Sequence, residues 1–552
     1  MKNSSSAIEE MTGNILFEHF ATLATAPGGI ARLRELILQL AVQGKLGTQG
    51  REDEAASVLL KKITAEKKQL VSDGKIRQEQ LLEPIENSGS PNNLPDKWCL
   101  SKLGEYCLVI MGQSPESKFY NENGSGLPFY QGKSEFGRLF PKPRVWCENP
   151  LKIAQKNDIL ISVRAPVGPT NICPSESCVG RGLAALRSLS GTSHFFLLYS
   201  LRAYEKLISE MGVGSTFSAI SKKDLDNFVI AVPPVAEQYR IIAKVDRLMA
   251  LCDELEARQQ QERAGCLKLG IASLAGLQNA TPPEVFGRQW TQVCDAFDLI
   301  LDCPENVKVL RQTILQLAVQ GRLVRQEPGN EPASVLLEII RKKKDQLIKD
   351  GALQKEKPLK YANGDEVPFQ IPKEWVWTYF GQITFNRDGT RIPIEKAERA
   401  TRHGAYDYYG ASGVIDTIDD YLFDKPLLLI GEDGANLVNR STPIAFIAHG
   451  KYWVNNHAHV LDGISLEFLR YLEIYINSID LKPYLTGMAQ PKMNQAKMNS
   501  IPVPLPPLAE QHRIVAMVDA LMALCDALES RLKERAGVQE RLAGAVVKQV
   551  AG

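Results

Sequence analysis

The residue types and spacings that could support catalysis are sparse in this sequence. A methyltransferase acting on the amino group of a base needs an Asp/Asn-Pro-Pro-aromatic turn, but the Pro-Pro pairs here are followed by Val235, Leu508 and Glu284. The stretch GSGLPFYQGKS, which ends at Lys133 and Ser134, resembles a phosphate-binding loop, yet its glycines are one residue too far apart. We therefore expect neither methyl transfer nor nucleotide binding from this chain.

Two histidines and ten cysteines are the other candidates for chemistry. His457 and His459 would lie on the same face of a strand, as two metal ligands could, but no third ligand is apparent. A hydrogen-bonding pair on a polar face is the favoured interpretation. The cysteines include no Cys-x-x-Cys pair, and Cys173 and Cys178 have no partner pair at matching spacing, which predicts reduced thiols in the protein cores. We name no catalytic residue and no metal site.

Length and composition describe an ordinary soluble protein of several domains. A chain of 552 residues is too long for one core. Its formal charge of +1 gives no bulk signal for nucleic acid, so any such surface must come from a local arrangement of charge. The first residues, MKNSSSAIEEMTG, do not form a signal peptide, and no apolar run approaches the roughly 20 residues needed to cross a bilayer. We expect a cytoplasmic protein without a membrane partner.

The elements that must position any functional residues occur twice. The stretch PPVAEQYRIIAKVDRLMALCDELE at 233–256 returns as PPLAEQHRIVAMVDALMALCDALE at 506–529, with 18 of 24 residues identical. LRELILQLAVQGKL at 33–46 returns as LRQTILQLAVQGRL at 310–323, with 11 of 14 identical. Proline cannot continue a strand ladder or sit inside a helix, so each Pro-Pro copy predicts an extended segment followed by a long helix.

Apolar residues in each long helix recur alternately four and three residues apart, which is a heptad pattern. The pattern predicts a helix seam through which the two copies face each other. A helix packed on a globular core is the alternative, because about two to three heptads are short for a coiled coil. The seam residues are Ile241, Val245, Leu248, Cys252 and Leu255 in the first copy and Ile514, Val518, Leu521, Cys525 and Leu528 in the second.

The spacing of the copies indicates the domain organisation. The two copies are offset by 277 from Leu33 to Trp98 and by 273 from Pro233 onward, so one ancestral half was duplicated. The middles of the two halves share little sequence, which predicts a pseudo-twofold protein with one variable module in each half. The expected divisions are a polar tail at 1–27, a shared helical region at 28–98, a first module at 99–232, a central shared helical region at 233–375 with the inter-half join at 276–309, a second module at 376–505 and a C-terminal shared helix at 506–552.

Both middles have the pattern of an α/β module. In the first, apolar runs at 158–163 and 182–189 predict strands, and 193–211 predicts a helix. In the second, the runs at 427–431, 443–448 and 459–463 predict strands, and 465–479 predicts a helix. The expected fold class is α/β, with two modules related by a pseudo-twofold and separated by long, antiparallel, coiled-coil-like helices.

This organisation resembles the specificity subunit of type I restriction-modification enzymes over nearly the whole chain after residue 30. The shared helical regions of that family are similar to ILQLAVQGKL and ILQLAVQGRL, to ASVLL followed by a charged helix, and to the PPxAEQ helix after each module. Its target-recognition domains are similar to ILISVRAPVGPTNI with CVGRGLAALR in the first module and to YYGASGVIDTIDDYLF with LLIGEDGANL in the second. The tail before residue 30 and the join at 276–309 depart from the family pattern.

The resemblance implies a non-catalytic subunit of a DNA adenine methyltransferase and restriction endonuclease complex. Each target-recognition domain would read one half of a split, asymmetric site in double-stranded DNA. The partners would be two methylation (M) subunits and two restriction (R) subunits, and AdoMet, ATP and Mg2+ would belong to those partners, with no cofactor in this chain. The alternative is a coiled-coil scaffold that binds proteins and no DNA, but divergent modules between near-identical helices favour DNA recognition.

The candidate DNA contacts lie on loops between strands and at the polar turn before the last helix of each module. Arg, Gln and Asn can each make two hydrogen bonds to a base edge, whereas Lys more often contacts phosphate. The second module has 12 Lys and Arg residues against 14 Asp and Glu residues, so its phosphate contacts must come from a few well-placed side chains or from partners. The candidates are Gln113, Ser114, Lys133, Arg164, Arg181, Ser215, Thr216 and Lys222 in the first module and Arg387, Arg391, Tyr409, Asn436, Arg440, Asn455, Asn456, His457, Gln490, Lys492 and Asn494 in the second.

Overall fold

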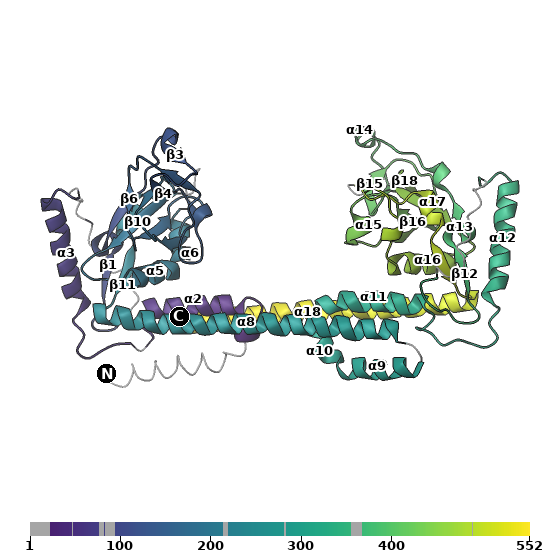
Figure 1. Cartoon of the computed structure of the whole chain (residues 1–552), viewed down its shortest axis with the longest axis horizontal. Coiled ribbons are helices and arrows are strands. Elements are labelled where there is room, and N and C mark those ends of the chain that lie inside the picture. The colour runs from purple at the N-terminus through teal and green to yellow at the C-terminus, as the bar shows by residue number, and fades with distance from the viewer. Residues whose placement is uncertain are drawn as a thin grey trace. The chain divides into compact units, whose positions relative to one another are not determined.

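The chain divides into two compact units, which we call unit 1 (residues 1–260 and 534–552) and unit 2 (residues 261–533). Each unit contains one α/β module and a set of long helices (Figure 1), which confirms the predicted fold class. The computed structural model describes residues 23–46, 48–76, 82, 85, 94–212, 219–280, 283–354, 367–487 and 490–551. No helix of this described part is long and apolar enough to span a membrane.

The module of unit 1, called module 1, is built on two sheets. A strand pair, β1 (Cys99–Lys102) with β11 (Val229–Val232), brings its two ends together. Residues in the central strands alternate between two cores, as the period of two along a strand requires: Ile159 and Ile161 pack with the helix that covers the sheet, whereas Leu160 packs toward the second sheet. The four-stranded sheet has the order β2 (Cys107–Met111), β10 (Leu183–Ser188), β7 (Ile159–Ser162), β8 (Thr170–Ile172), and the five-stranded sheet has the order β3 (Tyr120–Asn121), β5 (Val145–Cys147), β4 (Leu127–Tyr130), β9 (Ser177–Val179), β6 (Ile153–Ala154).

The module of unit 2, called module 2, repeats this plan. Its ends meet in β12 (Val376–Tyr379) and β20 (Pro502–Leu505). Leu428 and Ile430 pack with the covering helix, whereas Leu427 and Leu429 pack toward the second sheet. The four-stranded sheet has the order β13 (Phe385–Asn386), β19 (Ala458–Asp462), β16 (Leu427–Gly431), β17 (Ala445–Ala448), and the second sheet has only three strands, β15 (Gly413–Ile418), β14 (Tyr406–Gly410) and β18 (Tyr452–Val454).

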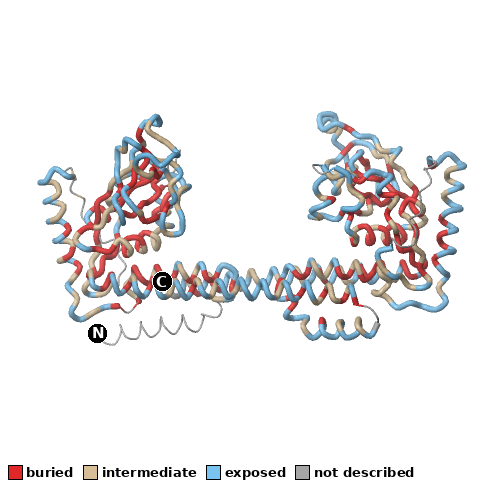
Figure 2. The backbone as a smooth tube through the Cα atoms, in the orientation of Figure 1, coloured by how far each residue is buried: buried red, intermediate tan, exposed pale blue. Residues whose placement is uncertain are grey.

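The two modules share one topology and differ in the size of the second sheet. In both, the four-stranded sheet is antiparallel, and the second sheet contains one parallel pair, β4 with β9 or β14 with β18. Buried residues concentrate in these sheets and in the helices that cover them (Figure 2). The covering helices are α5 (His194–Ala203) and α6 (Glu205–Met211) in module 1 and α16 (Leu466–Ser478) in module 2, with shorter helices α4 (Leu103–Tyr106), α7 (Lys222–Asn227), α13 (Phe380–Ile383), α14 (Lys396–Arg399), α15 (Asn436–Asn439) and α17 (Gln495–Asn499).

In unit 1 three helices pack beside module 1. α2 (Gly29–Val42) runs antiparallel to the start of α8 (Val235–Asn279), because Arg34 pairs with Asp253 while Lys244 donates to the carbonyl of Leu46. The last turns of α18 (Leu508–Ala551) join the same core through Ala543 and Val546. A charged helix, α3 (Ala56–Ser72), lies against the base of module 1.

Unit 2 has the same three-helix arrangement. α11 (Glu305–Val319) runs antiparallel to the start of α18, because Arg311 pairs with Asp526 at 2.6 Å while Gln326, just beyond α11, donates to Glu510. The end of α8 joins this core, and Gln278 donates to Thr313 of α11 at 2.9 Å. The charged helix of this unit is α12 (Ala333–Lys349), and the join between the halves forms α9 (Pro283–Asp295) and α10 (Phe297–Leu301).

The seam residues of each long helix form a buried or half-buried face, and in each unit this face shares a core with the shorter repeated helix. In unit 1, Leu248, Cys252 and Leu255 line one apolar groove together with Leu33 and Ile37 of α2. In unit 2 the seam residues of α18 share a core with α11. The reason is that α2 and α11 carry their own apolar stripes and lie directly along the seam, so they supply the facing residues.

A buried carboxylate at the start of α8 fixes module 1 to its helix. Glu237 is only 1% exposed, and it accepts hydrogen bonds from Trp98 Nε1 and Thr48 Oγ1, both at 2.9 Å. Burial raises the pKa of this carboxyl, and the two donors oppose that effect. The neighbouring Gln238 accepts from Tyr106 at 3.2 Å and donates to the carbonyl of Pro233 at 3.2 Å. The Ala-Glu-Gln motif therefore joins helix, strand β1 and module through buried polar contacts.

The second copy of the motif makes the same connections in unit 2. Glu510 is fully buried, accepts from Trp375 Nε1 at 2.9 Å and accepts from Gln326. Burial also raises its pKa against the effect of these donors. Gln511 donates to the carbonyl of Pro506 at 2.9 Å.

We expect Trp98→Phe to destabilise unit 1, because it leaves the buried carboxylate of Glu237 with one donor fewer. The loss should be about 1–3 kcal/mol of unfolding free energy. Trp375→Phe is the matched variant and should destabilise unit 2 by a similar amount. Hydrogen exchange read separately over β1–β11 and β12–β20 measures each effect, and equal loss of protection in both units from one variant would contradict local anchoring.

Candidate nucleic-acid interface

The ends of several strands of module 1 meet around one turn. Residues 180–182 connect β9 to β10, and Gly180 donates to the carbonyl of Tyr130, which ends β4, at 2.8 Å. Gly182 accepts from the backbone of Val163, just after β7, at 2.9 Å. A Cβ on Gly182 would lie 2.2 Å from the carbonyl oxygen of Gln131, so this close approach of two chain segments requires glycine. We call the residues gathered here the strand-end surface of module 1, namely 112–114, 131–133, 163–166, 180–182 and 219–222.

All six predicted contacts that the structure describes in module 1 lie on this surface. Gln113, Lys133, Arg164 and Arg181 are exposed. Ser114 accepts a hydrogen bond from the backbone of Arg181 at 3.2 Å, and Lys222 pairs with Asp226 at 3.0 Å within α7. The predicted contacts Ser215 and Thr216 lie outside the described residues.

Module 2 has a strand-end surface at the same place in its fold. The turn 455–457 connects β18 to β19, and Asn455 donates to the carbonyl of Tyr409 at 3.1 Å, as Gly180 does to Tyr130. Glu432 donates to the carbonyl of His457 at 2.8 Å, as Val163 does to Gly182. The strand-end surface of module 2 comprises residues 387–391, 409–411, 431–434, 455–457 and 490–494.

A second pair of backbone contacts closes both surfaces in the same way. Arg164 forms a bridge with Ala219 in module 1, and Asp433 forms a bridge with Lys492 in module 2. Positions 219 and 492 are related by the same offset of 273 that relates the repeated long helices. The two surfaces are therefore one backbone frame carrying different side chains.

Acidic residues outside the set of predicted contacts lie at the centre of the module 2 surface. Glu432 pairs with Arg391 at 2.9 Å and with Lys492 at 3.2 Å. Burial disfavours the charged form of Glu432, but these cations hold its pKa below the ordinary value. Asp433 accepts from His457 Nδ1 at 2.8 Å, and both side chains are partly exposed. The sequence GEDG directly after a predicted strand was the available signal for these acids.

A buried histidine fastens the loop after β13 to the surface. His459 Nδ1 lies 2.6 Å from Asp388, and its Nε2 lies 2.8 Å from the carbonyl oxygen of Met493. Both partners are acceptors, so an imidazolium that donates from both nitrogens satisfies them. Burial alone would lower the pKa of His459, but the hydrogen bond and charge of Asp388, the Met493 carbonyl and the charge of Glu432 raise it. The same ion pair holds the pKa of Asp388 below its ordinary value despite burial.

Several predicted contacts of module 2 are engaged inside the fold. Arg387 pairs with Asp462 at 3.0 Å, and Arg440 donates to the carbonyls of Asn477 and Ile479. Asn455 is buried and accepts from the backbone of His457. Tyr409 stacks on Phe446, and Asn436 bonds to Thr442. Asn494 caps α17 with its side chain and is nevertheless exposed. The other exposed candidates of module 2 are Asn456, His457, Gln490 and Lys492.

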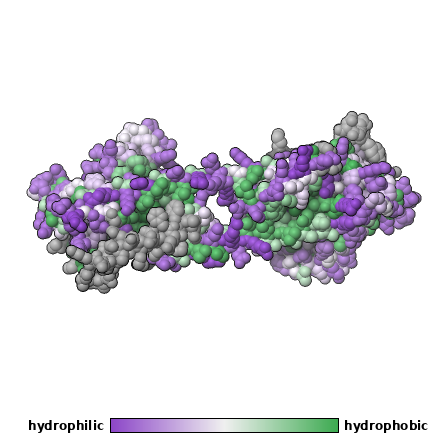
Figure 3. All heavy atoms as spheres, turned by 90° about the horizontal axis from the view of Figure 1, so that it is seen from below, coloured by the Kyte–Doolittle hydropathy of each residue, from purple (hydrophilic) through white to green (hydrophobic). Residues whose placement is uncertain are grey.

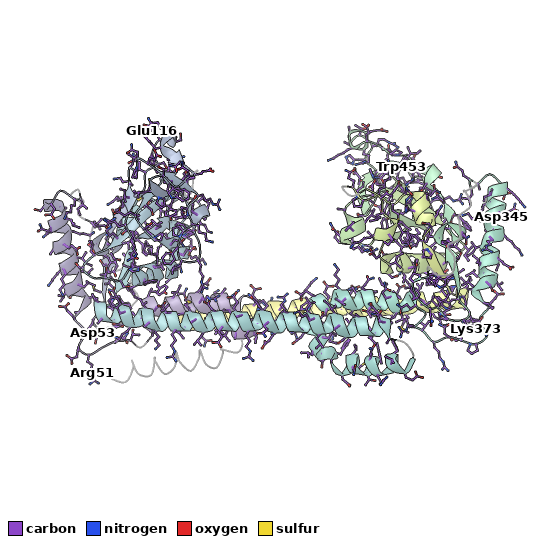
Figure 4. All side chains as sticks on the ribbon, viewed as in Figure 1. Arg51, Asp53, Glu116, Asp345, Lys373 and Trp453 are labelled. Atoms are coloured by element: carbon purple, nitrogen blue, oxygen red, sulfur yellow. The ribbon has the colours of Figure 1, made fainter. Side chains whose placement is uncertain are left out.

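The small sheet of module 2 is braced by arginines against aromatic rings. Trp453, labelled in Figure 4, donates from Nε1 to the carbonyl of Ile392 at 2.7 Å, and the guanidinium of Arg402 lies 5.2 Å from its ring centroid. Arg399 lies 4.7 Å from the ring centroid of Tyr408 and pairs with Asp416. Such contacts stabilise the sheet that supports the turn 455–457.

No group of three or more His, Cys, Asp and Glu side chains is placed to hold a metal ion among the described residues. His457 and His459, considered above as metal ligands, each pair with a separate carboxylate instead. The chemistry that the strand-end surfaces offer is hydrogen bonding and charge, which is the chemistry of base and phosphate recognition.

The fold and these surfaces define a class of protein with two recognition modules on duplicated helices. The family model for the type I restriction modification DNA specificity domain matches residues 95–263 and 372–536. The chain belongs to the family of type I restriction-modification specificity subunits.

Two similar proteins match this chain in sequence along nearly its whole length. The chain is 29% identical over 562 residues to the type I restriction enzyme EcoEI specificity subunit of Escherichia coli, covering 94% of this chain and 93% of that protein. It is 29% identical over 556 residues to the EcoAI specificity subunit of the same organism, with the same coverage. The solved HsdS subunit from Thermoanaerobacter tengcongensis is 41% identical over 37% of this chain and 47% of that chain, with a TM-score of 0.29.

We expect the stability of module 2 to fall as the pH rises above neutrality. The folded-state pKa of His459 is raised, so the stabilisation from its charge is complete below the ordinary histidine pKa of about 6.5 and is lost as the pH rises through the folded-state pKa. Hydrogen exchange of β16 and β19 between pH 6 and pH 9 measures this effect.

The control is module 1, where Ala184 pairs with Ile161 as His459 pairs with Ile430. β7 and β10 should lack this pH response. His459→Phe should destabilise module 2 by about 1–3 kcal/mol at pH 6, because Asp388 loses its histidine partner and, in the described part of the chain, keeps only Val460 and Arg391, and it should remove the pH dependence. A variant that retains the wild-type pH response would refute the assignment to His459.

Proposed function

We propose that this chain is the non-catalytic, DNA-reading subunit of a type I restriction-modification complex. Each module reads one half of a split, asymmetric site in double-stranded DNA. The chain recruits two methylation subunits and two restriction subunits. AdoMet, ATP and Mg2+ bind to those partners, which perform methylation and cleavage.

The observation that carries this proposal is the pair of strand-end surfaces. The same backbone hydrogen bonds hold the turns 180–182 and 455–457, while the side chains presented there differ in size, charge and hydrogen-bonding type. Sequence in DNA is read by contacts to base edges in the grooves, whereas contacts to phosphate carry no sequence information directly. The backbone arrangement is the same in both modules while the exposed side chains differ, which supports two modules that recognise different DNA sequences.

The duplicated helices support the recruitment of paired partners. Leu251 is 48% exposed and Leu524 is 65% exposed, and they occupy equivalent positions in identical Met-Ala-Leu-Cys-Asp stretches. The face shown in Figure 3 carries hydrophobic residues beside hydrophilic ones in the parts belonging to each unit. The two leucines offer the same exposed apolar contact in each unit, and two equal copies match two identical partners.

Exchange of one module tests the independence of the two readers. We expect that replacing residues 99–232 by the corresponding module of another family member changes one half of the methylated site and leaves the other half unchanged. The strand pair β1–β11 closes the exchanged segment, so the replacement keeps the helices intact. Sequencing of methylated bases in cells that co-express the chain with its methylation subunits gives the readout.

The reciprocal exchange of residues 376–505 is the matched control and should alter only the other half. A change in both halves from either exchange would contradict independent reading. If the assembled complex bound its protein partners but no DNA, the chain would be a protein scaffold and the proposed function would fail.

A further inference from the structure

The most informative difference between the strand-end surfaces is a reversal of charge at one backbone position. Leu183 pairs with Ser162 in module 1, and Ala458 pairs with Gly431 in module 2, so Arg164 and Asp433 each stand two residues beyond equivalent strand positions. Each also forms the bridge that closes its surface, with Ala219 or Lys492. Arginine and aspartate therefore occupy one place in one frame.

The turn beside this position also differs in charge. Arg181 is the middle residue of the turn 180–182, as Asn456 is of the turn 455–457. The backbone bond between Val163 and Gly182 places Arg164 and Arg181 on adjoining segments. Both arginines are exposed, and among the described residues no carboxylate lies within ion-pair distance of either guanidinium. Module 1 thus presents two unneutralised guanidinium groups on one surface.

Module 2 presents the carboxylate of Asp433 at the same place, and His457 fixes its position. Both oxygens of Asp433 lie within hydrogen-bonding distance of His457 Nδ1, at 3.0 and 2.8 Å. The Asp433 side chain is 31% exposed and that of His457 is 51% exposed. The hydrogen bond fixes the direction of the carboxylate while leaving it in contact with solvent. A carboxylate is an acceptor and cannot pair with the acceptor atoms O6 and N7 of guanine.

We infer that the two modules read opposite kinds of base edge from this shared position. Arg164 and Arg181 of module 1 recognise guanine through its O6 and N7 acceptors, which a guanidinium can engage with two hydrogen bonds. Asp433 of module 2, positioned by His457, accepts a hydrogen bond from the exocyclic amino group of cytosine or adenine in the major groove. This inference rests on the proposed function and adds which atoms of the DNA each module selects.

The inference is tested on the whole chain assembled with its methylation subunits. The wild-type complex first supplies the methylated site. Binding is then measured to duplexes in which 7-deazaguanine replaces each guanine of the first half-site in turn. One such replacement should weaken wild-type binding about tenfold or more, and Arg164→Ala or Arg181→Ala should abolish that sensitivity. For the second half-site, purine replaces adenine and 2-pyrimidinone replaces cytosine, which removes one amino group at a time. One of these should weaken binding by the wild type and leave binding by Asp433→Ala, which has no acceptor on its side chain, unaffected.

Matched controls lie at the opposite ends of the same strands. Lys156→Ala removes an exposed positive charge before β7, and Asp424→Ala removes an exposed negative charge before β16. Both should keep the analogue sensitivity of the wild type. His457→Gln should weaken the discrimination between bases at the position that Asp433 reads, and the position itself should stay the same.

Failure of this inference is distinguishable from failure of the proposed function. If the wild-type complex yields no methylated site and binds no DNA, the proposed function is wrong. If a two-part site is found but no guanine analogue affects binding through Arg164 or Arg181, the assignment for module 1 is overturned. If Asp433→Ala retains the analogue sensitivity of the wild type, the assignment for module 2 is overturned.

Discussion

The contact on which each unit depends is a buried carboxylate that accepts a hydrogen bond from a tryptophan. Glu237 and Glu510 stand at the first turn of the long helices, and Trp98 and Trp375 precede the first strand of each module. A charge buried without donors is strongly unfavourable, so each carboxylate is stable only when the tryptophan segment is seated against the helix. The contact therefore couples the packing of each module to the first turn of its long helix, and it explains why both copies contain these residues.

Anchoring at the base leaves the far end of each module free to vary. The strands β7 and β16 are buried along their length and supply the rigid support, while the turns beyond their ends are held mainly by backbone hydrogen bonds. Backbone bonds form with almost any side chain, so exposed residues such as Arg181 can change at little cost to stability.

Much of the fold could be predicted because its signals are local. The apolar run at 158–163 became β7 and that at 427–431 became β16, whereas the helix expected over 193–211 is interrupted at Tyr204. The candidate contacts depended on residue type, and their role as DNA contacts stays a prediction. Arg391 is held by Glu432, and Asp433 meets Lys492, although the members of each pair are far apart in the sequence. No local pattern indicates such pairings, although the sequence GEDG after a predicted strand was a signal for the acids themselves.

The placement of the last turns of α18 has a consequence for synthesis. Ala543 and Val546 are buried in the core of unit 1, alongside helices that begin before Gln260 in the chain. Ribosomes add about 5–20 residues per second, so unit 1 waits roughly 14–55 s between the synthesis of Gln260 and that of Glu534. During that interval an apolar strip of unit 1 has no cover from its own chain. The core of unit 1 is therefore completed only after the last turns of α18 have been synthesised.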